Sequence, residues 1–216
     1  MLSTAGANRD PRSRAVTTGD AAAALRAGDP AGAADAARRA LAARPGDPAA
    51  ANLLAMALHR LGRVDEAAAL AEAVTRGVPR FPDAWNTLGA LRRATGRPHD
   101  AVRCFREAVR LDPAFVEAWA NLGRALDVLG RSPEMLEAFR AAASLAPDDP
   151  AVLAGLGRAL TLAGDLGGGR AALARALAAA PDDLSAAVDL ATNRAYDGDY
   201  AGAVDLLAGL ADRAPD

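Results

Sequence analysis

Few side chains in this sequence have the chemistry of a catalytic or metal site. The two histidines, His59 and His99, lie far apart, and neither has a cysteine or carboxylate at ligand spacing on its own helix face. Cys104 is the only cysteine, and we expect it on a helix, with no histidine and no helix N-terminus to activate a thiolate. These three residues therefore give no indication of a metal centre or of a nucleophile.

The run Gly167-Gly168-Gly169 is the nearest approach to a phosphate-binding loop. It precedes a helix, whose N-terminus favours anions, but no strand precedes it. Arg170 also stands where a P-loop has lysine followed by serine or threonine. We interpret the run as the loosened start of a helix. Elsewhere in the chain, the adjacent carboxylates Asp65 and Glu66 are interpreted as a solvated helix start and not as a catalytic acid pair. We predict no enzymatic activity, no cofactor and no metal.

The composition and the net charge exclude several classes of protein. The chain has 216 residues and a net charge of −2, so no overall field attracts nucleic acid or an anionic membrane. Every basic residue is arginine, which we interpret as the codon bias of a GC-rich bacterial genome. Residues 1–13 are polar, resemble no secretory signal and are expected to be disordered. With a single cysteine and no long apolar run, the sequence predicts a cytoplasmic location.

Two residue types recur with a fixed period. Glycine and proline interrupt helices and strands more strongly than other residues do, and both recur here in steps of 34 without an insertion. The glycines stand at 28, 62, 96, 130, 164 and 198, and the prolines at 45, 79, 113, 147, 181 and 215. We therefore divide residues 14–216 into six units: 14–47, 48–81, 82–115, 116–149, 150–183 and 184–216.

Each unit contains two apolar helical patterns separated by its glycine. Glycine ends the first helix and proline stops the second. Asp47, Ser132 and Asp149, each followed by proline, are expected to be N-caps. The expected helices are 48–61, 64–78, 82–95, 98–111, 116–129, 133–145, 150–163, 167–179, 184–197 and 200–213, with a weaker pair in 14–47.

The third and fourth units resemble tetratricopeptide repeats, in the segments AWNTLGALRRATGRPHDAVRCFREAVRLDP and AWANLGRALDVLGRSPEMLEAFRAAASLAP. That family has a large apolar residue and then Leu-Gly on its first helix, small residues on its second, and a late proline. The matching residues are Trp85, Leu88, Gly89, Ala101, Phe105, Ala108 and Pro113, then Trp119, Leu122, Gly123, Phe139, Ala142 and Pro147, with Met135 replacing a small residue. Gly89, Gly123 and Gly157 are expected to let paired helices approach closely. Thr17 and Asp20 depart from the pattern, so we expect 14–47 to be a polar cap.

The resemblance implies an all-α fold, an α-solenoid of six 34-residue helical hairpins forming a right-handed superhelix. Its concave groove would be lined by the first helices and would bind a peptide or protein segment. The residues carried over to this groove are Asn52, Met56, His59, Asn86, Arg93, Asn121, Arg124, Asp127 and Arg158.

Two features of the expected groove point to peptide chemistry. Asn86 and Asn121 could hydrogen-bond the amides of an extended peptide, because each offers a donor and an acceptor. Arg93, Arg124 and Arg158 could form a basic stripe that holds the carboxylates of an acidic ligand. The alternative is that Glu117 and Asp127 neutralise these arginines, and the sequence leaves both interpretations open.

The resemblance favours a protein-interaction scaffold. An alternative is the N-terminal recognition arm of a larger bacterial enzyme of glycosyltransferase, sulfotransferase or oxygenase type. Nucleic-acid binding ranks last, because stacking needs aromatic side chains in the groove, and Trp85 and Trp119 occupy core positions.

The last unit has no further helix to cover it. Relatives usually add a polar-faced helix at this point, so Leu207, Leu210 and Ala211 are expected to form an apolar end face. We expect a second copy of the chain, giving a homodimer, or a following domain to cover this face.

Overall fold

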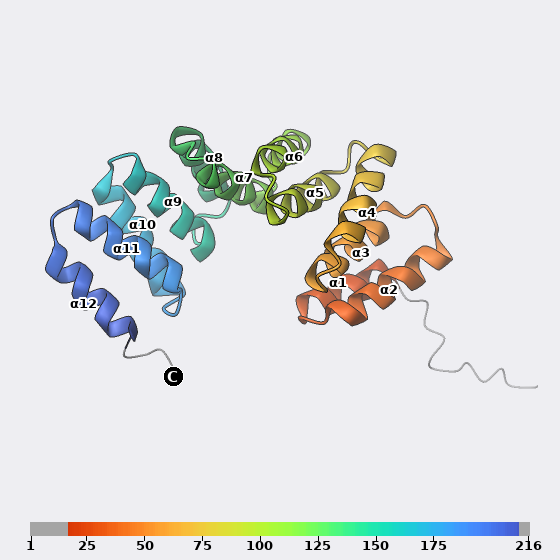
Figure 1. Cartoon of the computed structure of the whole chain (residues 1–216), viewed down its shortest axis with the longest axis horizontal. Helices are drawn as coiled ribbons and strands as arrows, with labels where there is room; N and C mark the ends of the chain where they lie inside the picture. The colour runs from red at the N-terminus through yellow and green to blue at the C-terminus, as the bar shows by residue number, and fades with distance from the viewer. Residues whose placement is uncertain (1–16, 212–216) are drawn as a thin grey trace, which may run out of the picture. The chain divides into compact units, whose positions relative to one another are not determined.

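The computed structural model describes residues 17–211, with side chains up to residue 209, and every regular element in that range is a helix (Figure 1). Consecutive helices form antiparallel hairpins, as the repeat predicted, and the fold is an all-α repeat solenoid. The helices are α1 (Thr18–Arg26), α2 (Pro30–Ala43), α3 (Pro48–Arg60), α4 (Val64–Gly77), α5 (Pro82–Ala94), α6 (Pro98–Leu111), α7 (Val116–Val128), α8 (Ser132–Leu145), α9 (Pro150–Leu162), α10 (Leu166–Ala179), α11 (Leu184–Tyr196) and α12 (Tyr200–Ala211).

Glycine ends the first helix of every hairpin. The six periodic glycines all have a positive φ, between 66° and 85°, and no other residue in the described range does. This left-handed conformation costs glycine little because it has no Cβ atom. Helix starts are capped as expected at Asp47 and Asp149, whose carboxylates accept backbone N–H groups of α3 and α9. The expectation for Ser132 was wrong: α8 already begins at Ser132, and Arg131 is the N-cap.

Small residues let the two helices of a hairpin pack closely. A Cβ atom on Gly89 would lie 2.6 Å from the Phe105 ring, and one on Gly123 would lie 2.6 Å from the Phe139 ring. A Cβ on Gly157 would lie 2.5 Å from Leu173. Each phenylalanine or leucine therefore occupies the space that a side chain on the facing helix would take, as the sequence predicted.

The helices group into two compact parts, Met1–Pro79 with α1–α4 and Arg80–Asp216 with α5–α12. In the N-terminal part, α1 and α2 form a regular hairpin whose buried residues are mostly alanine. Thr17 and Asp20, which depart from the repeat pattern, serve as the start of α1: the Thr17 N–H donates to the Asp20 carboxylate over 2.7 Å.

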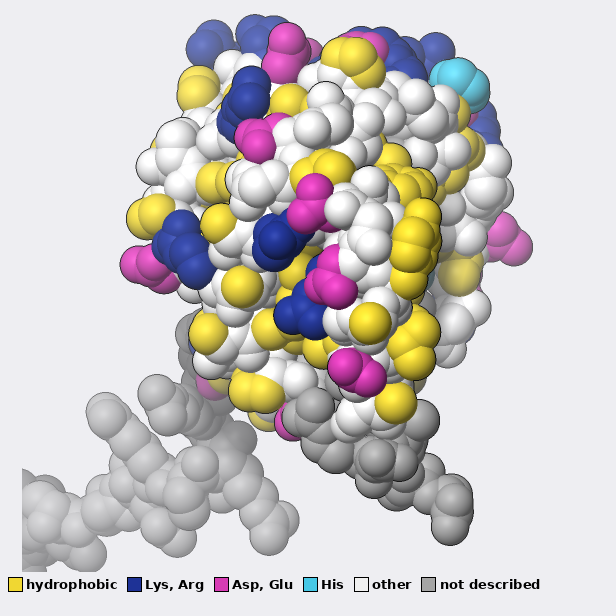
Figure 2. Space-filling view, turned by 90° about the vertical axis from the view of Figure 1, so that its left-hand side faces the viewer, with side chains coloured by type: hydrophobic (Ala, Val, Ile, Leu, Met, Phe, Trp, Pro, Cys, Tyr) yellow, Lys and Arg dark blue, Asp and Glu magenta, His cyan; other side chains and the backbone are white. Residues whose placement is uncertain are grey.

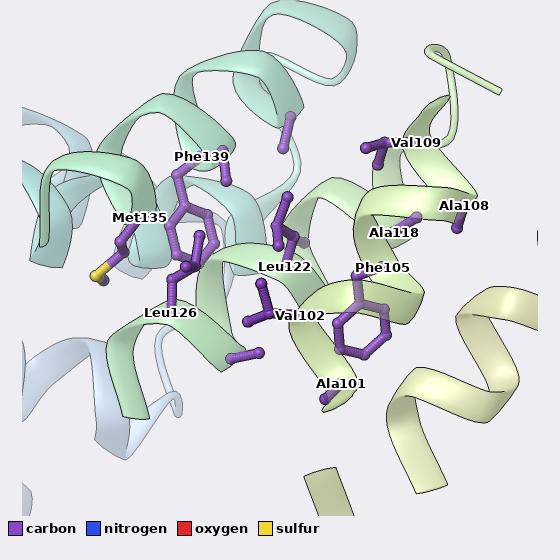
Figure 3. Packing of buried hydrophobic residues seen from close by; sticks show 14 of the residues in the cluster. Ala101, Val102, Phe105, Ala108, Val109, Ala118, Leu122, Leu126, Met135 and Phe139 are labelled. Carbon is purple, nitrogen blue, oxygen red and sulfur yellow. The ribbon is translucent and has the colours of Figure 1, made fainter. Parts of the chain in front are cut away.

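The core of the C-terminal part is centred on two phenylalanines (Figure 3). Phe105 and Phe139 are fully buried, and Leu122 and Leu126 of α7 lie between them in sequence and pack in the same cluster. Trp85 and Trp119 are only partly buried and pack against the edge of this cluster. They are the chain's two tryptophans, so tryptophan fluorescence reports on the C-terminal part alone.

A buried asparagine ties α11 to the preceding hairpin. Asn193 is fully buried and donates to the Thr161 hydroxyl over 2.8 Å and to the Leu166 carbonyl over 3.0 Å. A Cβ atom on Gly169 would come within 3.0 Å of Asn193 and closer still to Thr161, so glycine there makes room for this contact. The network fixes the register of α9, α10 and α11 on one another.

Candidate peptide-binding face

The first helices of the C-terminal part, α5, α7, α9 and α11, form one face, which we call the first-helix face. Polar residues on it contact partners 31 residues later, on the first helix of the next hairpin. This spacing is one helical turn less than the 34-residue repeat, because neighbouring first helices lie side by side with a small offset. Most of the side-chain contacts between neighbouring first helices follow this spacing.

Asn86 and Asn121 meet at the start of this face. The Asn121 amide donates to the Asn86 Oδ1 over 2.8 Å, and the Asn86 amide donates to Glu117 over 3.3 Å. Both asparagines are buried, at 7% and 5% exposure. Much of their hydrogen-bonding capacity is therefore used within the protein. Their contact with a peptide stays a prediction.

Arg124 is held by an amide and not by a carboxylate. Its guanidinium donates to the Asn121 Oδ1 over 2.8 Å. Partial burial and the neighbouring cation Arg93 lower the pKa of Arg124, while Glu117 and Asp149 act more weakly in the opposite direction. Neither Arg93 nor Arg124 forms an ion pair with a described residue, so two cations lie close together on α5 and α7 without a bound carboxylate.

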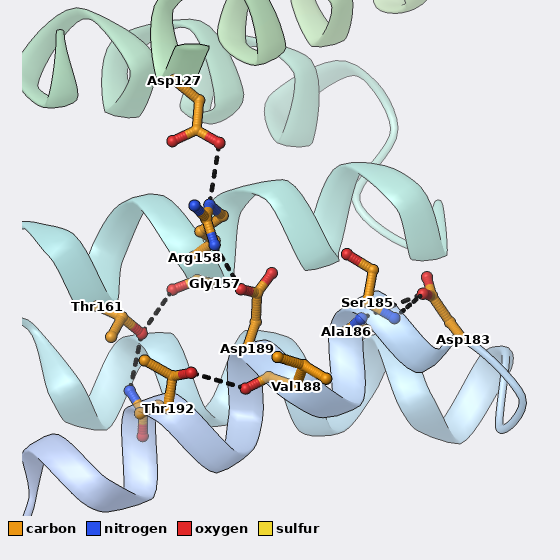
Figure 4. A network of polar contacts seen from close by, with 11 residues as sticks. Asp127, Gly157, Arg158, Thr161, Asp183, Ser185, Ala186, Val188, Asp189 and Thr192 are labelled. Carbon is orange, nitrogen blue, oxygen red and sulfur yellow. Dashed lines mark hydrogen bonds and ion pairs between the residues drawn. The ribbon is translucent and has the colours of Figure 1, made fainter. Parts of the chain in front are cut away.

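Arg158 is neutralised, in contrast to Arg124. Its guanidinium donates to Asp127 of α7 over 3.0 Å and to Asp189 of α11 over 2.7 Å, so it joins three first helices (Figure 4). The hydrogen bond that Arg158 donates to Asp189 contributes most to raising the pKa of Arg158, and burial raises the pKa of the Asp189 carboxyl. Pairing with Asp127 was the alternative that the sequence left open. Asp189 was not predicted, although its separation of 31 residues from Arg158 repeats that of Asp127.

A pocket with a volume of about 480 Å³ opens on this face between α7, α9 and α11. Its floor includes Phe139 of α8, and its rim carries Arg124 on one side and Asp183 and Asp189 on another. Three of the four residues that α9 contributes to the lining are small, namely Ala151, Ala154 and Gly155, and they leave room for the pocket; the fourth is Arg158. A larger residue at position 155 would require the Phe139 ring to shift, since a Cβ atom on Gly155 would lie 2.1 Å from that ring.

Three predicted groove residues lie in the N-terminal part, on α3. Asn52 is buried, and its amide lies 3.8 Å from the Met56 sulfur. Its Oδ1 is buried without a hydrogen-bond partner among the described residues. Met56 and His59 are partly buried on the same helix. A role for these three residues in ligand binding stays a prediction.

Cys104 and the glycine run at 167–169 lie in surroundings that do not favour reactivity or phosphate binding. Cys104 is 7% exposed, and burial raises the pKa of its thiol to about 11. The glycine run lies inside the first turns of α10, with Asp165 as N-cap: the Asp165 carboxylate accepts the Gly168 N–H over 2.9 Å. A carboxylate thus occupies the position where a phosphate would bind. Within residues 17–211, no three potential metal ligands come together and no helix is long and apolar enough to cross a membrane.

The last hairpin exposes large apolar side chains. Leu207 is 42% exposed, whereas Phe105, Phe139 and Leu173, at the same position of the three preceding repeats, are buried. Tyr196, Tyr200 and Val204 are also exposed on this hairpin. Figure 2 shows hydrophobic side chains between the charged ones on the side of the molecule where α12 lies. The side chains of Leu210 and Ala211 lie outside the described residues, so their place in a self-association face stays a prediction.

Comparisons with known proteins agree with the repeat. Sequence patterns of the tetratricopeptide repeat match residues 24–91, 86–150 and 136–193. The comparison with curated proteins found no match. Among solved structures, TTC0263, a thermophilic TPR protein from Thermus thermophilus, is 24% identical, with a TM-score of 0.66 over 80% of this chain and 94% of that one.

Two further structures share the fold. YrrB, a TPR protein with an unusual peptide-binding site, is 20% identical, with a TM-score of 0.69 over 85% of this chain and 94% of its own. PilF of Pseudomonas aeruginosa is 17% identical, with a TM-score of 0.77 over 89% and 88%. The matched sequence patterns together cover residues 24–193, more than half of the chain, and they show that this chain belongs to the tetratricopeptide-repeat family.

Proposed function

We propose that this protein is an interaction scaffold whose first-helix face binds an extended segment of a partner protein. The tetratricopeptide-repeat fold serves in general as a scaffold for protein–protein interaction. The observation that supports a binding role for this particular face is the pocket of about 480 Å³ over Gly155. Its size lies within the range of pockets that hold a ligand group.

The lining of the pocket suits a peptide side chain. Phe139, Met135 and the small residues of α9 give an apolar floor, and charged groups at the rim offer hydrogen bonds to a backbone or to polar neighbours. Such a combination binds an apolar side chain in the pocket while the rest of the segment lies along the face. We propose no catalytic role. An attached enzyme domain, the alternative considered from the sequence, stays a prediction.

The test uses peptides selected from a random twelve-residue library displayed on phage, with the full chain immobilised. Ala151 lies on the pocket rim and is exposed, so Ala151→Trp should fill the pocket without disturbing the core. Ala174 on α10 is also exposed and lies outside the pocket lining, so Ala174→Trp is the matched control.

We expect Ala151→Trp to weaken the binding of selected peptides at least tenfold in fluorescence anisotropy, a change of about 1.4 kcal/mol. Ala174→Trp should leave their affinity unchanged. Failure to select any peptide, or equal binding to both variants, would contradict the proposal.

A further inference from the structure

The first-helix face contains a like-charged pair in a register that elsewhere holds ion pairs. Asp127 and Arg158 are 31 residues apart and form an ion pair of 3.0 Å between adjacent first helices. Arg93 and Arg124 have the same separation and occupy the same two positions one repeat earlier. The repeat therefore places two guanidinium groups across from each other where the next repeat has an aspartate and an arginine.

The surroundings of this pair hold one arginine in place and leave both charges unneutralised. Asn121 accepts a hydrogen bond from Arg124 and is itself bonded to the buried Asn86. A guanidinium has five N–H donors, and Arg124 uses one of them on this amide. Both arginines expose part of their surface to solvent, although the guanidinium group of Arg124 is partly buried. The mutual effect of Arg93 and Arg124 also helps to lower the pKa of Arg124.

The arginine pair and the pocket share a residue. Arg124 lines the pocket over Gly155, and Gly155 itself follows Arg124 by the same 31 residues. Moving along the face, the order is therefore Arg93 on α5, Arg124 on α7 and the apolar pocket on α9. Packed helices lie about 8–10 Å apart, which is about three residues of an extended chain.

We propose that the partner segment has a carboxylate that binds between Arg93 and Arg124 and, about two to four residues away, an apolar side chain that fills the pocket over Gly155. This inference rests on the proposed function and specifies the ligand for the same face. Two arginines in this arrangement match a carboxylate, which accepts hydrogen bonds from both. The carboxylate can belong to an aspartate or glutamate side chain or to the end of the partner chain.

The experiment uses the peptides selected on the full chain as above, synthesised with a fluorescent label. We expect them to share an acidic residue or a free C-terminus about two to four positions from a leucine, methionine or phenylalanine. Arg93→Ala and Arg124→Ala should each weaken their binding about tenfold or more, because each removes a charged hydrogen-bond donor. Arg140→Ala removes the same charge from an exposed site on α8 and should change nothing.

Reversing the charge of Arg124 provides a stricter test of the proposed carboxylate contact. Arg124→Glu should lose the selected peptides and gain those in which the acidic residue is replaced by arginine. Amidating the peptide C-terminus distinguishes a terminal carboxylate, whose binding is lost, from a side chain, whose binding is kept. Circular dichroism of each variant confirms that the helices remain.

The proposed function and the further inference can be refuted independently. Selected peptides that lack a carboxylate, or that bind Arg93→Ala and Arg124→Ala normally while Ala151→Trp abolishes binding, would overturn the inference and leave the proposed function standing. Selected peptides whose affinity is also unchanged by Ala151→Trp would refute both proposals.

Discussion

Replacing Gly155 by alanine puts a methyl group into the slot that holds the Phe139 ring. The new Cβ atom would lie 2.1 Å from the ring, whereas carbon atoms normally approach to about 3.5 Å. The ring cannot move away toward α7, because a Cβ atom on Gly123 would already lie 2.6 Å from its other side. Phe139 is thus confined by a glycine on each edge.

The expected cost follows from two opposing effects. Overpacking of a filled core costs about 1–3 kcal/mol. Alanine in place of glycine within a helix recovers about 0.5–1 kcal/mol. We therefore expect Gly155→Ala to lower the free energy of unfolding of the C-terminal part by up to about 2.5 kcal/mol. Gly167→Ala is the control, because its new methyl group meets no atom within 4 Å, and it should be neutral or stabilising.

Urea unfolding followed by tryptophan fluorescence measures this effect, since both tryptophans lie in the C-terminal part. A double-mutant cycle with Phe139→Leu isolates the clash, because the smaller side chain leaves room for the methyl group. Gly155→Ala should be much less harmful in the Phe139→Leu background. Equal effects of Gly155→Ala in both backgrounds, or stabilisation by Gly155→Ala alone, would refute the packing argument.

Four further predictions concern the rest of the molecule. Leu122→Ala, which truncates a residue of the main core, should destabilise the C-terminal part by about 2–5 kcal/mol in the same urea assay, and a loss below about 1 kcal/mol would contradict its placement. Arg93→Asp should give Arg124 an ion pair like that of Asp127 with Arg158, raising the unfolding free energy by about 0.2–1 kcal/mol while abolishing acidic-peptide binding; a loss of stability would argue against proximity of the two arginines. Cys104, whose thiol pKa is raised to about 11, should react slowly with a thiol reagent at pH 8 and faster as the pH rises toward that value, and rapid labelling of the folded protein would contradict its burial. Leu207→Asp together with Val204→Asp should convert a self-associating protein into a folded monomer in light scattering, whereas a monomeric wild type would rule out association through this face.

The helices and their ends could be predicted from local chemistry. Gly96 and Gly130 end helices because they adopt a conformation that other residues avoid, and this property acts wherever glycine occurs. The close approach of the two helices of a hairpin at Gly89 and Gly123 could also be predicted, because a missing side chain leaves room for any residue on the facing helix. The start of α8 was misjudged at Ser132, because the N-cap depends on backbone angles that neighbouring residues share in setting.

The groove was harder to predict because its residues act on one another. Asn86 and Asn121 were expected to offer their amides to a peptide, but the offset between α5 and α7 brings them within 2.8 Å of each other. The same offset decides that Arg158 is neutralised while Arg124 is not. A search for charged residues 31 apart would have found the partners of Arg158, but not the contact between Asn86 and Asn121, which are 35 apart. The pocket could not have been found this way, because it depends on where the Phe139 ring lies beneath Gly155.

A partner segment that lies on the first-helix face would cover the small residues of α9. Alanine-methyl NMR of the C-terminal part, titrated with a selected peptide, tests this most directly. Ala151 and Ala154 line the pocket, and Ala174 and Ala178 are exposed on the other helix of the same hairpin. We predict that the methyl signals of Ala151 and Ala154 shift on binding while those of Ala174 and Ala178 stay in place. Shifts confined to Ala174 and Ala178 would place the ligand on the opposite side and contradict the account.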